Sequence, residues 1–187
     1  MARRPFLGIL AAFAATAGFG RAQAQVSLYQ QNELIEAARD NDGDEVAALL
    51  SRGIRPNATD TRRRTPLILA VGHRNQAMVD ALLAYGARTQ AIDDAGNTAL
   101  YYAAESGHYG IVNSLVEAGA PVDTRNQSGR TPLMAAAREG HHRVVQRLLD
   151  AGANPSLADY TGRTAAMWAE NSRSPQTINL LRTAEGS

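Results

Sequence analysis

A period of 33 residues organises nearly the whole sequence. Threonine recurs at this spacing at Thr65, Thr98, Thr131 and Thr164. Four more series keep the same interval: Ala37, Ala70, Ala103, Ala136 and Ala169; Val46, Val79, Val112, Val145 and Ile178; Leu49, Leu82, Leu115, Leu148 and Leu181; and Gly53, Gly86, Gly119 and Gly152. Five independent positions holding one period over four or five cycles exclude chance. Such a period is typical of an array in which each unit packs mainly on its neighbours.

Each position in the cycle has a structural reason, which is clearest in residues 127–159. Thr131 is a good N-cap, and Pro132 fits a first helical turn, where its missing N–H costs nothing. An alanine-rich run then predicts a short helix that packs closely on its neighbours. After a turn, an apolar stripe predicts a second helix, with the residues Val144, Val145, Leu148 and Leu149. Gly152 is expected to end that helix in the left-handed conformation.

Helix, turn, helix and projecting turn every 33 residues, with Thr-Pro-Leu at the start, resemble the ankyrin repeat. The resemblance covers about residues 28–187 and implies an all-α solenoid of helix-turn-helix units with projecting turns. We predict one domain over residues 25–187 with five repeats, at about 28–60, 61–93, 94–126, 127–159 and 160–187. The first and last units diverge most, as expected of terminal caps with one face in water.

One slot departs from the family pattern. After Thr-Pro-Leu the family has a histidine that ties neighbouring repeats together through hydrogen bonds. Here the slot holds Ile68, Tyr101, Met134 and Met167. We therefore expect the repeats to cohere more through apolar packing, with moderate stability.

The N-terminus has the pattern of a cleavable signal peptide. Two arginines form a positive n-region, residues 6–19 are a 14-residue run without charge, and residues 22–24 give a small-x-small cleavage site. The uncharged run is too short to span a membrane. We predict cleavage after Ala24, so that residues 1–24 are removed.

The two arginines also favour one export route. Arg3 and Arg4, followed by Phe6-Leu7, resemble a twin-arginine signal, although Ala2 and Gly8 depart from its usual pattern. General secretion is the alternative. Either route predicts a periplasmic or secreted protein.

Charge and composition narrow the function further. The whole chain has a formal net charge of +1, but loss of Arg3, Arg4 and Arg21 leaves 16 arginines against 18 carboxylates. A nucleic-acid partner is therefore not expected. The absence of cysteine excludes disulfides, thiolate nucleophiles and a lipidated cysteine, and the absence of lysine excludes Schiff-base chemistry. We predict no stable membrane anchor.

No residue pattern predicts catalysis. His108 and His141 occupy the turn of the repeat, where a structural role is expected, and His73 is expected to be exposed. Adjacent His141 and His142 point apart on a helix and lack a third ligand, so no metal site is expected. The glycines are periodic, which marks turns rather than a phosphate loop, and no nucleophile elbow is present. We predict a protein that is not an enzyme and has no cofactor.

The resemblance implies that a protein partner binds the turn tips and the concave face of the first helices. Carried over by position, the candidate partner-binding residues are Arg62, Arg63, Arg64, Leu69, His73, Asp94, Asn97, Tyr102, Glu105, Arg130, Arg138, Tyr160, Arg163 and Trp168. Aromatic residues and arginines most often anchor interfaces. In the alternative interpretation, Trp168 covers the last repeat, Tyr102 packs on Tyr101, and the arginine run is only a solvated tip.

The sequence thus predicts an exported, non-enzymatic protein-binding module that is monomeric on its own. Small exported bacterial ankyrin proteins to which it is similar include a class that supports a periplasmic catalase against peroxide. Another class acts as immunity proteins that neutralise a toxin or lipase. The resemblance implies both possibilities, and the sequence does not choose between them.

Overall fold

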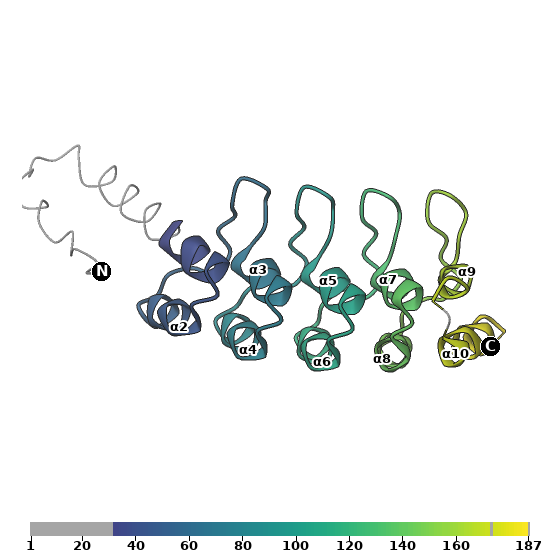
Figure 1. Cartoon of the computed structure of the whole chain (residues 1–187). Coiled ribbons are helices and arrows are strands. Elements are labelled where there is room, and N and C mark those ends of the chain that lie inside the picture. The colour runs from purple at the N-terminus through teal and green to yellow at the C-terminus, as the bar shows by residue number, and fades with distance from the viewer. Residues whose placement is uncertain (1–31, 173, 187) are drawn as a thin grey trace, which may run out of the picture.

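The protein is a row of stacked helix pairs with turns that project from one side (Figure 1). It is seen in a computed structural model that describes residues 32–172 and 174–186; the expected signal peptide and its cleavage site lie outside these ranges. Helical residues 32–39 pair with α2, the first labelled helix. The helices that follow are α2 (Gly43–Ser51), α3 (Pro66–Gly72), α4 (Gln76–Ala84), α5 (Ala99–Glu105), α6 (Tyr109–Glu117), α7 (Pro132–Glu139), α8 (His142–Asp150), α9 (Ala165–Ala169) and α10 (Pro175–Glu185).

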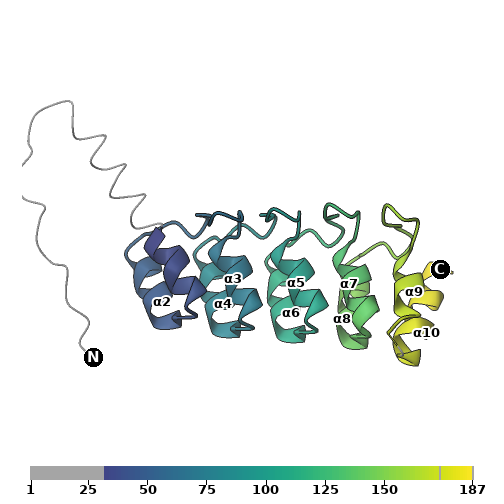
Figure 2. The same cartoon turned by 45° about the horizontal axis from the view of Figure 1, so that its top comes forward.

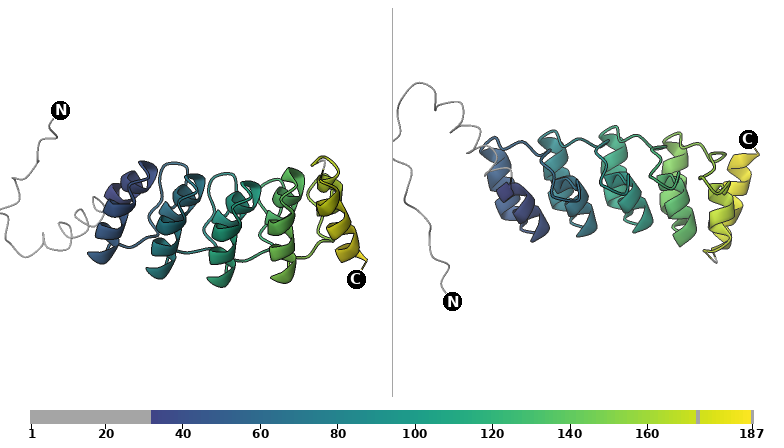
Figure 3. Two further views of the ribbon diagram at one scale, coloured as in Figure 1. Left: turned by 60° about the horizontal axis from the view of Figure 1, so that its bottom comes forward. Right: turned by 90° about the horizontal axis from the view of Figure 1, so that it is seen from above.

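The helices form two layers. The first helix of each pair lies nearer the projecting turns, so that residues 32–39, α3, α5, α7 and α9 form an inner row and the even-numbered helices an outer row (Figures 1 and 2). Helices of one row pack on the next member of that row, as α5 does on α7 and α6 on α8. The other views show the same regular progression along the stack (Figure 3). We call the inner helices together with the projecting turns the inner face. This architecture confirms the predicted all-α solenoid.

The helix ends follow the predicted local rules. The hydroxyls of Thr65, Thr98 and Thr131 accept hydrogen bonds from backbone N–H groups three residues later, at 3.2–3.4 Å. Pro66 and Pro132 occupy the first helical positions. Gly152 has a φ of +87°, which confirms the expected left-handed stop after α8.

The periodic residues form one continuous core. The leucine and valine series and the alanines Ala70, Ala103, Ala136 and Ala169 are fully buried, except for Ile178, which is partly buried. Burying one leucine contributes about 1.5–3 kcal/mol, and the alanines let the inner helices approach closely. The 33-residue period is therefore the packing period of the array. Among the described residues, no helix has the length and apolar character needed to cross a membrane.

The slot that lacks the family histidine is apolar and buried, as expected, in three repeats. Ile68, Tyr101 and Met134 are at most 4% exposed, whereas Met167, on the last inner helix described, is 51% exposed. Polar hydrogen bonds between repeats come from other positions, among them His141, for which the sequence analysis expected a structural role. The ring Nε2 of His141 lies 3.1 Å from the Glu105 carbonyl oxygen, one repeat away.

Candidate functional site

Each projecting turn is organised around one carboxylate or amide side chain. These residues also follow the 33-residue period: Asp60, Asp93, Asn126 and Asp159. In each, Oδ1 accepts hydrogen bonds from the backbone N–H groups two and four residues later, at 2.8–3.1 Å. The turns are thus held from within. The sequence analysis did not identify this series, although its members are spaced by the same 33 residues.

The second carboxylate oxygen connects a turn to the inner helix beside it. Asp93 Oδ2 accepts a 2.6 Å hydrogen bond from the Tyr102 hydroxyl, and Asp159 Oδ2 accepts one of 3.0 Å from Trp168 Nε1. Two of the candidate aromatic residues are therefore fixed by the turns. At Asp60 the same oxygen instead pairs with Arg64, whose Nη2 lies 2.8 Å away.

These contacts set the charge state of the turns. Burial raises the pKa of Asp159, but hydrogen bonds from Thr161, Arg163 and Trp168 outweigh it and lower the pKa to about 2. Burial also raises the pKa of Asp60, but hydrogen bonds from Arg64 and Arg62 outweigh this effect and lower the pKa. Both groups are carboxylates at neutral pH.

Tyr102 is half-buried, and its hydroxyl both donates and accepts a hydrogen bond within the fold. Its oxygen donates to Asp93 and accepts a 3.0 Å hydrogen bond from Asn97 Nδ2. Burial and the bond to Asp93 raise the pKa of Tyr102, so it stays protonated. Its ring also contacts Tyr101 edge-to-face, with centroids 6.0 Å apart, as the alternative interpretation expected.

Three of the candidate partner-binding residues, Asn97, Trp168 and Leu69, are buried rather than exposed. Asn97 is buried, and its Oδ1 accepts from Asn126 Nδ2 at 2.9 Å, so it links two turns. Trp168 is only 9% exposed. A partner at that end of the inner face would meet charged groups rather than the indole. The burial of Trp168 agrees with the alternative interpretation, in which Trp168 covers the last repeat. Leu69 is 6% exposed and contributes a floor, not a projecting anchor.

The covering groups over Trp168 are two guanidinium groups. The Arg130 guanidinium lies 4.3 Å and the Arg163 guanidinium 5.0 Å from the ring centroid. Such cation–π contacts are favourable, by about 0.5–2 kcal/mol each. Both candidate arginines are therefore engaged in covering the tryptophan.

The arginine run divides into two kinds of residue. Arg64 is held by Asp60 through Nε at 2.9 Å and Nη2 at 2.8 Å. Arg62 and Arg63 are exposed at the turn and make no ion pair within the described residues. Of the three arginines in the run, only Arg62 and Arg63 carry a charge that no described residue pairs with.

Glu105 and Arg138 neutralise each other. Arg138 Nη2 lies 2.8 Å from Glu105 Oε1 across the boundary between two repeats, and its Nε lies 2.8 Å from Glu139 Oε1. These candidates thus form a half-exposed bridge between α5 and α7. At such exposure the bridge contributes little, about 0–1 kcal/mol.

A hollow of about 330 Å³ brings four of the candidates together. It lies between the second and third repeats and is lined by Arg64, Ile68, Leu69, Gly72, His73 and Tyr102. We call it the Gly72 hollow. Exposed His73 stands at the rim, with its ring Nε2 2.9 Å from the Arg39 carbonyl oxygen.

Asp94 and Tyr160 lie away from this hollow, on the projecting turns of the third and fifth repeats. Asp94 is exposed, and its backbone N–H donates to the Arg62 carbonyl at 3.1 Å. Tyr160 is 72% exposed and lies against Gly129, where a Cβ would come within 2.8 Å of it. Both side chains are available to a partner at the turn tips.

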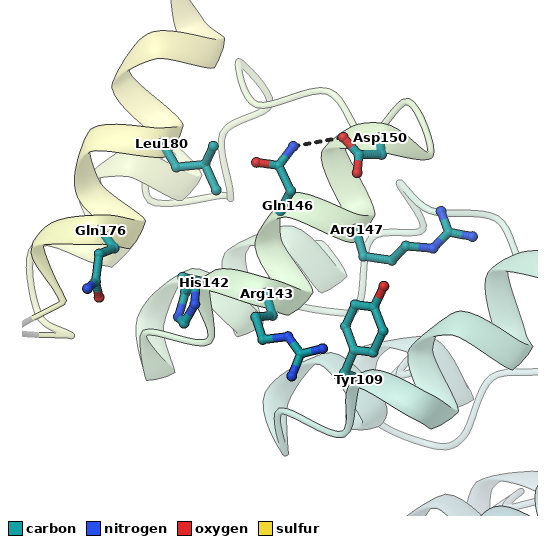
Figure 4. Close-up of a pocket in the computed structure, with 8 residues that line it drawn as sticks. All are labelled: Tyr109, His142, Arg143, Gln146, Arg147, Asp150, Gln176 and Leu180. Atoms are coloured by element: carbon teal, nitrogen blue, oxygen red, sulfur yellow. Dashed lines mark hydrogen bonds between the residues drawn. The ribbon is translucent and has the colours of Figure 1, made fainter.

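A second hollow, of about 390 Å³, lies on the opposite, outer row (Figure 4). Arg143 stacks on Tyr109, 4.7 Å from the ring centroid, and Gln146 bonds Asp150 on the same helix at 2.7 Å. The sequence analysis assigned none of these residues, and they follow no periodic series. Over the parts of the chain that the structure describes, no cluster of three or more histidines and carboxylates could hold a metal ion.

The comparisons agree with this architecture. A family model described as ankyrin repeats (3 copies) matches residues 34–126 and again residues 116–186. The family model describes three copies, and its two matches overlap at residues 116–126, whereas the described residues hold five helix pairs. A search of curated proteins found no match. Ankyrin repeats are protein–protein interaction modules, and this chain belongs to the ankyrin repeat family.

Proposed function

We propose that this chain is an exported, non-enzymatic protein that binds a protein partner through its inner face. The Gly72 hollow and its surroundings carry this proposal. An apolar floor and a fixed aromatic ring line the hollow, and the turn that contributes Arg64 to it also carries the unpaired Arg62 and Arg63. Aromatic residues and arginine are enriched in the cores of protein interfaces, which makes this surface the best candidate in the described chain.

The proposed location is the periplasm. It rests on the signal-like pattern of residues 1–24, with two arginines, an uncharged run and a small-x-small site. Replacing Arg3 and Arg4 with lysine tests the twin-arginine route, since that pathway requires the arginine pair. Export should stop in this variant, and normal export would show that general secretion is used instead.

For the partner itself we propose an oxidative-stress enzyme such as a periplasmic catalase. The support is the similarity to small exported bacterial ankyrin proteins with that role. The alternative partner, a secreted toxin or lipase neutralised by an immunity protein, has the same kind of support. A toxin or lipase gene beside this one would favour the alternative.

Affinity capture from the producing cell's periplasm tests the interface and the partner together. The bait is the C-terminally tagged full-length chain, processed as the cell processes it. The inner-face variant carries Arg62→Ala, Arg63→Ala and Asp94→Ala, which remove exposed side chains that make no ion pair with the described residues. A matched outer-face variant carries Arg143→Ala, Gln146→Ala and Gln176→Ala.

A catalase captured by the wild type and the outer-face variant, and lost from the inner-face variant, supports the proposal. A toxin or lipase with the same pattern supports the immunity role. Equal capture by all three baits would show that the inner face is not the interface.

A further inference from the structure

We infer that the Gly72 hollow receives an apolar side chain from an acidic segment of the partner. This inference rests on the proposed function and makes it specific. It assigns the partner a chemistry, namely one apolar residue with carboxylates beside it. Shape, charge and the placement of one glycine support it.

The floor and wall of the hollow are apolar and rigid. Ile68 and Leu69 are 4% and 6% exposed and form a closed floor. The Tyr102 hydroxyl is engaged by Asp93 and Asn97, so the tyrosine contributes its ring rather than a polar group. At about 330 Å³ the open hollow is near the lower limit for ligand pockets, about 300 Å³. It therefore suits a side chain presented by a larger molecule.

The turn next to the hollow carries three arginines against Asp60, and the exposed Asp94 lies on the neighbouring turn. Arg62 and Arg63 lie on the turn that carries Arg64, which lines the hollow, and neither has an acidic partner among the described residues. The Asp60 carboxylate is already occupied by Arg64. A partner with carboxylates next to its apolar residue would pair these two arginines and gain association rate from them.

A glycine keeps the hollow open. The positions equivalent to Gly72 in the next two repeats hold Glu105 and Arg138, which bridge each other. A Cβ at Gly72 would meet nothing within 4 Å, and its φ is not in the left-handed region. Glycine in a helix costs about 0.5–1 kcal/mol relative to alanine. The fold would therefore accept a side chain at this position, but such a side chain would obstruct the hollow.

Gly72 also gives a plug that preserves the fold. Gly72→Gln adds a neutral side chain of good helix propensity into open space. Ala77→Gln adds the same side chain at an exposed position of α4, in the same repeat, and serves as its control. For charge, Arg62→Gln with Arg63→Gln is compared with Arg52→Gln and Arg55→Gln, exposed arginines after α2 that remove the same charge elsewhere.

The probe is a displayed library of random 12-residue peptides, selected on the immobilised full-length chain and measured individually by fluorescence anisotropy. We expect enriched peptides to carry one large apolar residue flanked by aspartate or glutamate. Their Kd should rise at least tenfold in Gly72→Gln and in the Arg62→Gln, Arg63→Gln pair. The two control variants should bind like the wild type, and thermal melts should show all variants folded.

Three results would overturn the inference: no enriched peptide, enriched peptides without carboxylates or without an apolar residue, or equal binding to Gly72→Gln. Failure here is distinguishable from failure of the proposed function. If periplasmic capture is lost in the inner-face variant but unchanged in Gly72→Gln, the inner face binds the partner without using the hollow.

Discussion

Tyr102 and Trp168 occupy the same repeat position at two places on the inner face, yet their surroundings differ. Each is fixed by a turn carboxylate, Asp93 at 2.6 Å or Asp159 at 3.0 Å. Tyr102 lines an open hollow, whereas Trp168 is buried under two guanidinium groups. The aromatic residue alone therefore does not decide whether the surface is open to a partner.

The difference traces to the preceding turn. Arg64 and Arg130 are equivalent residues, one repeat before Tyr102 and Trp168 respectively. Arg64 is drawn to the carboxylate of Asp60 in its own turn, at 2.8 Å. In the fourth repeat that turn residue is Asn126, which carries no charge, and Arg130 instead extends over Trp168, with its Nε 3.9 Å from Oδ2 of Asp159 in the next turn. Arg163 also follows a turn carboxylate, Asp159, yet it lies over Trp168, because Asp159 Oδ2 already accepts from the indole N–H. A turn carboxylate thus holds the arginine of its own turn only where its second oxygen is free, as in Asp60.

The largest effect is expected from removing the carboxylate that fixes Trp168. Asp159→Ala deletes the acceptor of two backbone N–H groups, the Thr161 hydroxyl and the indole N–H, in a side chain that is 1% exposed. Leaving such buried donors unpaired should lower the free energy of unfolding by about 3 kcal/mol. Urea unfolding followed by circular dichroism and by the single tryptophan measures it.

Asp94→Ala is the control for this loss. Its carboxylate is exposed on an equivalent turn, so the free energy of unfolding should change by no more than about 0.5 kcal/mol. If Asp159→Ala were as stable as Asp94→Ala, the turn carboxylate would not anchor the last repeat.

A smaller effect is expected in acid. Because the pKa of Asp159 is lowered to about 2 from an ordinary value of 3.8, its contribution is complete above pH 4 and is lost as the pH falls toward 2. The shift corresponds to about 2 kcal/mol. The wild type should lose this much more stability between pH 4 and 2 than Asp159→Asn, by urea unfolding at each pH. Parallel losses would contradict the low pKa.

The sequence predicted those features of the fold that depend on local rules. Threonine caps and the glycine stop are read from neighbouring residues, and the leucine series is read from its period. The site was less predictable, because the position of a guanidinium group depends on competition between a turn carboxylate and an aromatic ring one repeat away. Arg130 and Arg163 cover Trp168 for this reason, whereas Asn97 is buried where its side chain bonds Tyr102 and Asn126. The Gly72 hollow was not predicted either, since it arises where one repeat lacks a side chain that its neighbours have.

The smallest expected effect tests what directs the arginine. Asn126→Asp places a carboxylate where Asp60 stands in the second repeat, so Arg130 should turn toward it and uncover part of Trp168, which Arg163 still covers. Tryptophan emission should move to longer wavelength and acrylamide quenching should increase. Stability should fall by only about 1 kcal/mol, because the bond from Asn126 Nδ2 to Asn97 is lost.

Ser128→Asp adds the same charge at an exposed site on that turn and should leave the emission unchanged. If both variants kept the wild-type emission, the turn residue would not control access to the inner face. A shift in Asn126→Asp alone would show that the residue at this turn, carboxylate or amide, decides whether Arg130 covers Trp168.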